Sequence, residues 1–373
     1  MLSKSLSVLA TGALLVLGCQ PGTPPVDIAI RADTLDDGPH VYWRDARNAV
    51  VFYLCDGAVE ISEVQVSDTL RFTGLCADSA TQYRISAQAP AVAPADYDGA
   101  PRILALSDIH GEYDAFVDIL QRAGVIDRQL RWTWGDGHVV ITGDVFDRGT
   151  KVTECLWLIY RLEQEARHAG GRMHMVLGNH ELMVLQGANY YVHDKYLNGI
   201  ARRSRVTHQD LYGPAMELGR WLRTKHTVIR VNGVLFVHGG VPPYLEDRGF
   251  DLDDVNRVVR AAASMPSYEV AFSDTARFML GSLGPLWYRG YHYGQDGRYP
   301  RATAEDVAGL LTTYDVTAIV VGHTESDRVE ALYDGAVFRI DVPVGRLGGF
   351  EALLWEDGRF YRVRTDGGRE RLR

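Results

Sequence analysis

The stretch Val139-Val-Ile-Thr-Gly-Asp144-Val-Phe-Asp147-Arg148-Gly149 places charged residues directly after a short apolar run. Four other apolar runs also lead into a residue type that binds metals: Ile103-Leu-Ala-Leu-Ser-Asp108, Met173-His-Met-Val-Leu-Gly-Asn179, Val234-Leu-Phe-Val-His238 and Ile319-Val-Val-Gly-His323. Such runs are typical of buried strands in an α/β protein, and helical patterns over 113–124 and 150–169 separate several of them. Because ligands gather at the carboxyl ends of strands in such sheets, the five strand ends predict one shared site.

Five motifs follow one another in order along this part of the chain. They are Asp108-Ile-His110-Gly111, Gly143-Asp144-Val-Phe-Asp147-Arg148-Gly149, Gly178-Asn179-His180-Glu181, Val237-His238-Gly239-Gly240 and Gly322-His323-Thr324. In these motifs the chain resembles the calcineurin-like metallophosphoesterases, specifically the phosphoprotein phosphatase branch, over about residues 102–350. The resemblance implies an α/β fold in which two mixed β-sheets, flanked by helices, form a four-layer sandwich. A single Gly-Asp or Gly-His pair would be weak evidence, but five ordered motifs make coincidence very improbable.

Departures from the family pattern narrow this resemblance. Ser107 replaces the usual glycine before Asp108, which exchanges one small residue for another. The carboxy-terminal Ser-Ala-Pro-Asn-Tyr stretch of eukaryotic Ser/Thr phosphatases is absent. In its place stands Phe338-Arg-Ile-Asp341-Val, followed by Gly348-Gly349, which is closer to the bacterial and Shewanella-like protein phosphatases. A preference for phosphoserine and phosphothreonine therefore does not carry over to this chain.

The resemblance assigns two adjacent metal ions to carboxylate, amide and imidazole ligands: Asp108 and His110 for the first ion, Asn179, His238 and His323 for the second, and Asp144 bridging the two. This mixture suits divalent ions of intermediate hardness, with manganese as the expected pair and iron or zinc as alternatives. A tyrosinate-bound iron site of the purple acid phosphatase kind is disfavoured, because Val145 and Phe146 occupy the loop after the bridging aspartate. Two such ions, about 3.5 to 4 Å apart, can share a hydroxide that acts as the nucleophile.

The same resemblance makes His180 the general acid that protonates the leaving alkoxide or phenoxide. Asp147 is expected to orient its imidazole, because a carboxylate partner keeps the ring basic and correctly aimed. Glu181 is expected to support this loop or to begin the following helix, where acidic groups are favoured.

Two arginines are expected to bind the phosphoryl oxygens, together with Asn179. Arg148 follows Asp147 directly, and a guanidinium can contact two phosphoryl oxygens at once. Arg289, within Trp287-Tyr-Arg289-Gly290, resembles the second phosphate-binding arginine of the branch; a surface arginine beside a core tryptophan is the alternative. The interval 187–226 is expected either to border the substrate cleft or to form a solvated helical excursion.

Composition and charge limit the classes of binding partner that the protein can have. The 373 residues are 46% hydrophobic, and 39 basic against 48 acidic residues give a net charge of -9, which argues against a broad surface for nucleic acid or an anionic bilayer. Strand-like alternation and an Ala/Pro-rich stretch predict four segments after an export signal at 1–19: a tether at 20–25, a small antiparallel β domain at 26–87, a linker at 88–101 and the catalytic domain at 102–373.

The N-terminus predicts export, with a short charged start followed by an apolar run. Val16-Leu-Gly-Cys19 resembles a lipoprotein processing site, so a lipid on Cys19 would anchor a periplasmic protein to the membrane. An ordinary signal with an incidental cysteine is the alternative. An oxidising compartment would also allow Cys55 and Cys76 to pair, although the sequence leaves this open, as it leaves the oligomeric state.

The expected activity is hydrolysis of phosphomonoesters, on phosphotyrosine or on phosphoserine and phosphothreonine in proteins or peptides. Within the same fold, dinucleoside polyphosphates or other small phosphate esters are the alternative substrates. A non-catalytic binding or anchoring protein is disfavoured, because all six ligand positions and His180 are present.

Overall fold

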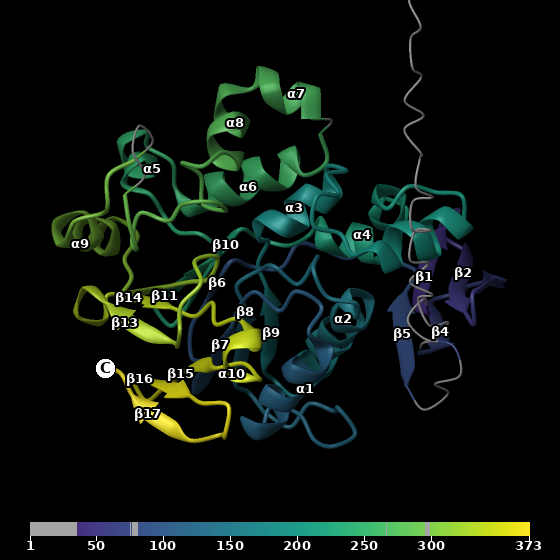
Figure 1. Cartoon of the computed structure of the whole chain (residues 1–373), viewed down its shortest axis with the longest axis horizontal. Coiled ribbons are helices and arrows are strands. Elements are labelled where there is room, and N and C mark those ends of the chain that lie inside the picture. The colour runs from purple at the N-terminus through teal and green to yellow at the C-terminus, as the bar shows by residue number, and fades with distance from the viewer. Residues whose placement is uncertain (1–35, 75, 77–80, 266, 295–298) are drawn as a thin grey trace, which may run out of the picture. The chain divides into compact units, whose positions relative to one another are not determined.

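The computed structural model describes residues 36–373 apart from 75, 77–80, 266 and 295–298, so the predicted signal, tether and Cys19 lie outside the described residues. Two six-stranded mixed sheets form the centre of the molecule (Figure 1). In spatial order, the first contains β13 (Glu330–Leu332), β14 (Val337–Arg339), β12 (Ala318–Val321), β11 (Val234–Val237), β10 (Val228–Val231) and β6 (Asp96–Tyr97). The second contains β17 (Arg369–Arg371), β16 (Arg359–Val363), β15 (Ala352–Glu356), β7 (Arg102–Leu106), β8 (His138–Ile141) and β9 (Arg172–Met175).

Helices surround the two sheets. The α-helices are α1 (Tyr113–Arg122), α2 (Val152–His168), α3 (Asn179–Leu185), α4 (Glu217–Leu222), α5 (Pro243–Asp247), α6 (Leu252–Ala262), α7 (Ser267–Phe272), α8 (Asp274–Leu280), α9 (Ala304–Thr313) and α10 (Val344–Leu347). Short helical segments of other types are η2 (Lys195–Ala201), η3 (Gln209–Tyr212) and η4 (Tyr333–Gly335). Among the described residues, no helix is both long and apolar enough to cross a membrane.

Side-chain alternation along the strands builds two separate apolar cores. On β7, Ile103 and Ala105 join the core between the two sheets, whereas Leu104 and Leu106 join the core that also contains the buried residues of α1 and α2. Phe338 of β14 stacks on Phe360 of β16 with ring centroids 4.2 Å apart, so one sheet packs directly on the other. These two cores produce the expected sandwich of sheets with helices outside.

Parallel pairing brings the predicted strand ends to one edge. Strands β7, β8 and β9 pair parallel in one sheet, and β11, β12 and β14 pair parallel in the other. All five strands predicted from the apolar runs are present, and α1 and α2 begin and end close to the predicted positions. The carboxyl ends of these strands meet where the candidate ligands were expected.

The N-terminal segment forms the expected antiparallel β structure. Strands β1 (Asp37–Trp43), β2 (Asn48–Cys55) and β3 (Ala58–Gln65) make one sheet, and β4 (Thr69–Thr73) pairs with β5 (Gln82–Ser86). Cys55 and Cys76 form a disulfide that closes this segment, with Cα atoms 5.5 Å apart. Cys155 of α2 is a free cysteine buried in the hydrophobic core.

The Ala/Pro-rich segment 88–101 differs from a simple linker. Strand β6 lies within it and extends the first sheet by pairing parallel with β10. Arg230 of β10 also pairs with Asp96 of β6, and Ala100 is buried in the core between the sheets. The end of this segment is therefore built into the catalytic domain, because sheet pairing fixes a backbone that its composition alone would leave free.

A buried carboxylate joins the N-terminal strands to the catalytic domain. Glu217 of α4 is 1% exposed and accepts hydrogen bonds from Trp43 Nε1 at 2.7 Å and from the Tyr160 hydroxyl at 2.8 Å. Arg220 neutralises its charge through a hydrogen bond of 2.7 Å. One acidic side chain thus connects β1, α2 and α4.

We expect Glu217→Ala to lower the free energy of unfolding by about 3 kcal/mol, because it leaves the buried donors of Trp43 and Tyr160 without an acceptor and Arg220 without its carboxylate partner. Denaturant unfolding followed by circular dichroism measures this loss. The matched control Glu60→Ala removes an exposed carboxylate of β3 and should change stability by less than about 0.5 kcal/mol. Equal effects of the two substitutions would contradict the connection.

Candidate active site

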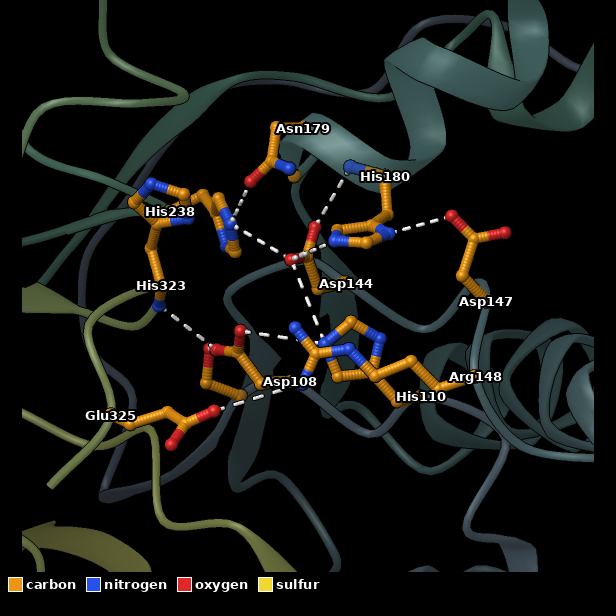
Figure 2. A network of polar contacts seen from close by, with 12 residues as sticks. Asp108, His110, Asp144, Asp147, Arg148, Asn179, His180, His238, His323 and Glu325 are labelled. Atoms are coloured by element: carbon orange, nitrogen blue, oxygen red, sulfur yellow. Dashed lines mark hydrogen bonds and ion pairs between the residues drawn. The ribbon is translucent and has the colours of Figure 1, made fainter. Parts of the chain in front are cut away.

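The centre of the site is the carboxylate of Asp144, directly beyond β8. Its Oδ2 lies 3.2 Å from His238 Nε2, 3.7 Å from His180 Nε2 and 3.9 Å from His110 Nε2. Figure 2 shows the carboxylate between these three rings: His110 follows β7, His180 lies at the start of α3, and His238 follows β11. Asp144 belongs both to a potential metal-binding group with His110 and His180 and to one with His238 and His323. This position suits a ligand shared by two ions.

The imidazole rings are held so that one nitrogen faces the centre. Nδ1 of His110 contacts the carbonyl oxygen of Phe146 at 2.6 Å, and Nδ1 of His238 contacts the carbonyl oxygen of Thr142 at 2.8 Å. Backbone partners of this kind fix the tautomer and orientation of metal-binding histidines. Nε2 of His110 and Nε2 of His323 are buried and have no hydrogen-bond partner in the described structure, as expected for atoms that can accept a metal.

The two remaining predicted ligands join the same cluster. Oδ1 of Asp108 lies 3.9 Å from His110 Nε2, while its Oδ2 accepts a hydrogen bond from the backbone of His323 at 3.0 Å. Oδ1 of Asn179 lies 2.9 Å from His238 Nε2 (Figure 2). Ser107, which departs from the family pattern, donates to Asp108 through its hydroxyl and thereby supports this ligand. The structure therefore brings together all six ligands expected from the sequence.

Glu181 holds the loops on which these ligands sit. Its buried carboxylate accepts backbone hydrogen bonds from Gly178 at 2.7 Å, Asp144 at 2.9 Å and Val145 at 2.7 Å. The expected supporting role is confirmed, and it joins the loop after β8 to the start of α3. Gly178 is required at this junction because a Cβ there would overlap the carboxylate of Asp144.

The site loops have strained backbones. Six residues with side chains adopt positive φ values at the site: Asp108, His110, Asp144, Asp147, Arg148 and His323. Each left-handed residue other than glycine costs on the order of 1 kcal/mol or more, and such strain collects at functional sites. The surrounding hydrogen bonds offset this cost and direct the side chains inward.

The protonation of the histidines depends on the charge of Asp144. Burial alone lowers the pKa of His238, but the charge of Asp144 and its hydrogen bond outweigh burial and raise the pKa to about 9. Burial, His238 and Arg289 instead keep the pKa of His323 well below its ordinary value. Since a metal requires neutral imidazole, ion binding at this site would displace a proton from His238.

His180 lies beside this cluster and is held by Asp147. Its Nδ1 is 2.6 Å from Oδ2 of Asp147, and its backbone N–H donates to Oδ1 of Asp144 at 3.0 Å. Burial lowers the pKa of His180, but the hydrogen bond to Asp147 and the charge of Asp144 exceed that effect and raise the pKa above its ordinary value. The ring is therefore protonated more readily than a free imidazole, and its Nε2 faces the metal-binding centre, 3.7 Å from Oδ2 of Asp144.

Arg148 and Arg289 occupy different positions. Arg148 is half-exposed at the edge of the site, and its Nη1 lies 3.8 Å from Oε1 of Glu325 (Figure 2). Arg289 donates to the backbone carbonyl of His323 and, at 3.2 Å, to the hydroxyl of Thr324. Arg289 is thus not a free surface arginine, since it holds the loop of a metal ligand; its contact with phosphate stays a prediction.

Three further residues at the site were not assigned there from the sequence. Asp341 is 4% exposed, and burial followed by the charges of Asp108 and Glu325 raises its pKa well above the ordinary value. Its sequence signal was present, because Asp341 follows β14 as the other ligands follow their strands. Tyr191, from the interval 187–226, places its ring centroid 5.1 Å from that of His180, so part of this interval borders the site. Neither Glu325 nor Tyr191 has a sequence motif that identifies it.

The residues present fit a pair of divalent ions. Two carboxylates, one amide oxygen and three imidazoles converge, and the unpartnered nitrogens of His110 and His323 face the centre. The sequence model of the calcineurin-like phosphoesterase family matches residues 101–326, which include all six of these ligands.

The chain belongs to the calcineurin-like phosphoesterase family. It is a metal-dependent phosphatase with a dinuclear divalent metal site.

Solved structures and curated relatives support the same assignment. The cold-active protein-tyrosine phosphatase of a psychrophilic Shewanella species has 34% sequence identity and a TM-score of 0.82, covering 91% of this chain and 99% of that one. Shewanella-like protein phosphatase 2 of Arabidopsis thaliana is 26% identical over 304 residues, covering 67% of this chain and 73% of its own length. A symmetrical bis(5'-nucleosyl)-tetraphosphatase of Methylococcus capsulatus is 31% identical over 249 residues, covering 59% and 80%.

We expect Asp147→Asn to move the basic limb of the kcat profile to lower pH. The substitution removes the carboxylate that stabilises the imidazolium of His180, so its pKa falls and the proton is lost at lower pH. The turnover of a phosphoserine peptide as a function of pH measures this shift, because its alkoxide leaves poorly without a proton. The exposed Asp118→Asn on α1 is the matched control, and an unchanged basic limb in Asp147→Asn would rule out the coupling.

Proposed function

We propose that this member of the family hydrolyses phosphomonoesters of proteins or peptides, with phosphotyrosine among its substrates and His180 as the general acid. The observation that carries the proposal is the 2.6 Å contact between His180 and Asp147, which directs the imidazole toward the site that would hold the metals. The similarity to protein phosphatases, at 34% identity for a protein-tyrosine phosphatase, supports a protein substrate.

Each step performed by the chain follows from a side chain already placed. Arg148, exposed at the edge, binds two phosphoryl oxygens of the incoming substrate, and Asn179 lies beside the same centre. When bound, two divalent ions supply Lewis acidity and a nucleophile derived from water. His180 then gives its proton to the leaving oxygen, and Asp147 stabilises the proton on the ring until transfer.

We further propose manganese as the metal, with iron or zinc as alternatives. Oxygen and imidazole ligands without thiolate support ions of this class. Metal analysis of the purified protein, together with reactivation of chelator-treated protein by each ion, distinguishes these choices.

The central test compares substrates and variants. With manganese, the protein should hydrolyse phosphotyrosine and phosphoserine peptides and p-nitrophenyl phosphate, and a chelator should abolish all three activities. We expect His180→Asn to reduce kcat about a hundredfold or more for phosphoserine but much less for the activated nitrophenyl ester, because only the poor leaving group needs a proton.

The control for this test is His168→Asn, which alters an exposed histidine at the end of α2. Equal losses on both esters in His180→Asn would argue against the general-acid role. Diadenosine tetraphosphate is included because of the tetraphosphatase relative; faster hydrolysis of it than of any phosphopeptide would favour that alternative.

For the location, we propose export to the periplasm and a lipid anchor on Cys19. The sequence before Cys19 supports this proposal, and the disulfide between Cys55 and Cys76 is compatible with an oxidising compartment. We expect an acylated N-terminus at Cys19 in the mature protein and its loss in Cys19→Ala, both measured by mass spectrometry. An unmodified mature N-terminus elsewhere would contradict the anchor.

A further inference from the structure

Two adjacent tyrosines stand at the edge of the site. Tyr190 is 85% exposed and Tyr191 is 53% exposed, although both are large aromatic side chains. The ring of Tyr191 packs on that of His180 at an interplanar angle of 50°, and its backbone carbonyl accepts a hydrogen bond of 3.0 Å from the N–H of Arg148. One residue therefore touches the general acid and is tied to the backbone of an arginine that would bind phosphate.

The position of His180 fixes the side on which the leaving group lies. A general acid must come within hydrogen-bond distance of the oxygen that it protonates. Since Nδ1 of His180 is occupied by Asp147, only Nε2 can serve, and the atoms bonded to the leaving oxygen must lie next to this ring. Tyr191 is packed on the same ring and still exposes half of its surface to an approaching substrate.

The depth of the site adds a second constraint. The six ligands and His180 are each at most 8% exposed, so a phosphoryl group must enter a recess to reach them. A phenyl ring between the phosphate and the peptide spans such a recess, whereas a serine side chain has only one methylene group. Aromatic rings also attract one another beyond the effect of buried area, which favours a phenyl group beside Tyr191.

The segment that carries Tyr191 is held in place. Nζ of Lys195, which is 4% exposed, donates to the carbonyl oxygen of Thr150 at 2.6 Å. The hydroxyl of Tyr196 accepts from the backbone N–H of Val152 at 2.7 Å. These bonds attach the segment to the start of α2, so Tyr191 needs little ordering when substrate binds.

We propose that Tyr191 is a specificity-determining residue whose ring forms a wall for aryl leaving groups and so favours phosphotyrosine over phosphoserine. The proposal rests on the proposed function, because it takes His180 as the general acid. It assigns the leaving-group side of the site to the interval 187–226, which no family motif covers.

The test uses Tyr191→Ala, Tyr191→Leu and Tyr191→Phe in the full, manganese-loaded protein. Two peptides of one sequence, carrying phosphotyrosine or phosphoserine, serve as substrates. We expect Tyr191→Ala to lower kcat/KM for the phosphotyrosine peptide about fivefold and for the phosphoserine peptide less than about twofold. Tyr191→Phe should keep the wild-type ratio, and Tyr191→Leu, which keeps an apolar side chain, should fall between them.

A binding measurement separates this role from an effect on His180. Calorimetric affinity for phenylphosphonate should fall about fivefold in Tyr191→Ala, while that for methylphosphonate stays the same. The proposal would be overturned if Tyr191→Ala lost activity equally on both peptides and shifted the pH profile. It would also be overturned if the ratio of kcat/KM for phosphotyrosine to kcat/KM for phosphoserine did not change.

Wild-type protein that hydrolyses neither peptide would instead overturn the proposed function, and the assignment of Tyr191 with it. Should Tyr191→Ala be unfolded by circular dichroism, the ratio in Tyr191→Leu decides.

Discussion

The buried carboxylate of Asp144, within 4 Å of three imidazole nitrogens, is the interaction on which the rest of the site depends. Burial opposes its ionisation, yet His238, His180 and His110 outweigh burial and keep its pKa well below the ordinary value. A buried charge is tolerated only where partners compensate it. The neighbouring histidines do this in the protein alone, and divalent ions would do it more strongly, so metal binding and the stability of the site are linked.

The strained loops of the site hold the carboxylate of Asp144 in position. Glu181 accepts the backbone N–H groups of Gly178, Asp144 and Val145, which positions the carboxylate and the start of α3 together. Each left-handed residue costs on the order of 1 kcal/mol, and these hydrogen bonds offset the cost. The two cores on either side of β7 and β8 fix the strands from which these site loops extend.

The sequence predicted this centre well because each ligand follows a buried strand, and parallel strands end at one edge. The same reasoning could have found Asp341, which follows β14, but no family motif drew attention to it. Glu325 follows the ligand His323 by two residues, and Tyr191 lies in the interval 187–226, but no motif singles out either side chain, so the sequence did not place them at the site. Strand β6 was also missed: two paired residues leave no periodic signal, and their structure comes from β10.

The N-terminal strands pack against the interval 187–226. Asp37 of β1 is fully buried; burial opposes its ionisation, but His40 and Lys195 lower its pKa overall, so a charge from β1 faces the segment that follows Tyr191. Trp43 reaches Glu217 on α4, and Nε1 of Trp157 donates to the carbonyl of Pro39 at 2.8 Å. Two positions within the interval, Lys195 and Glu217, thus face both β1 and α2. The N-terminal strands thus pack against the interval that carries Tyr191, while the six ligands and His180 all come from the catalytic domain.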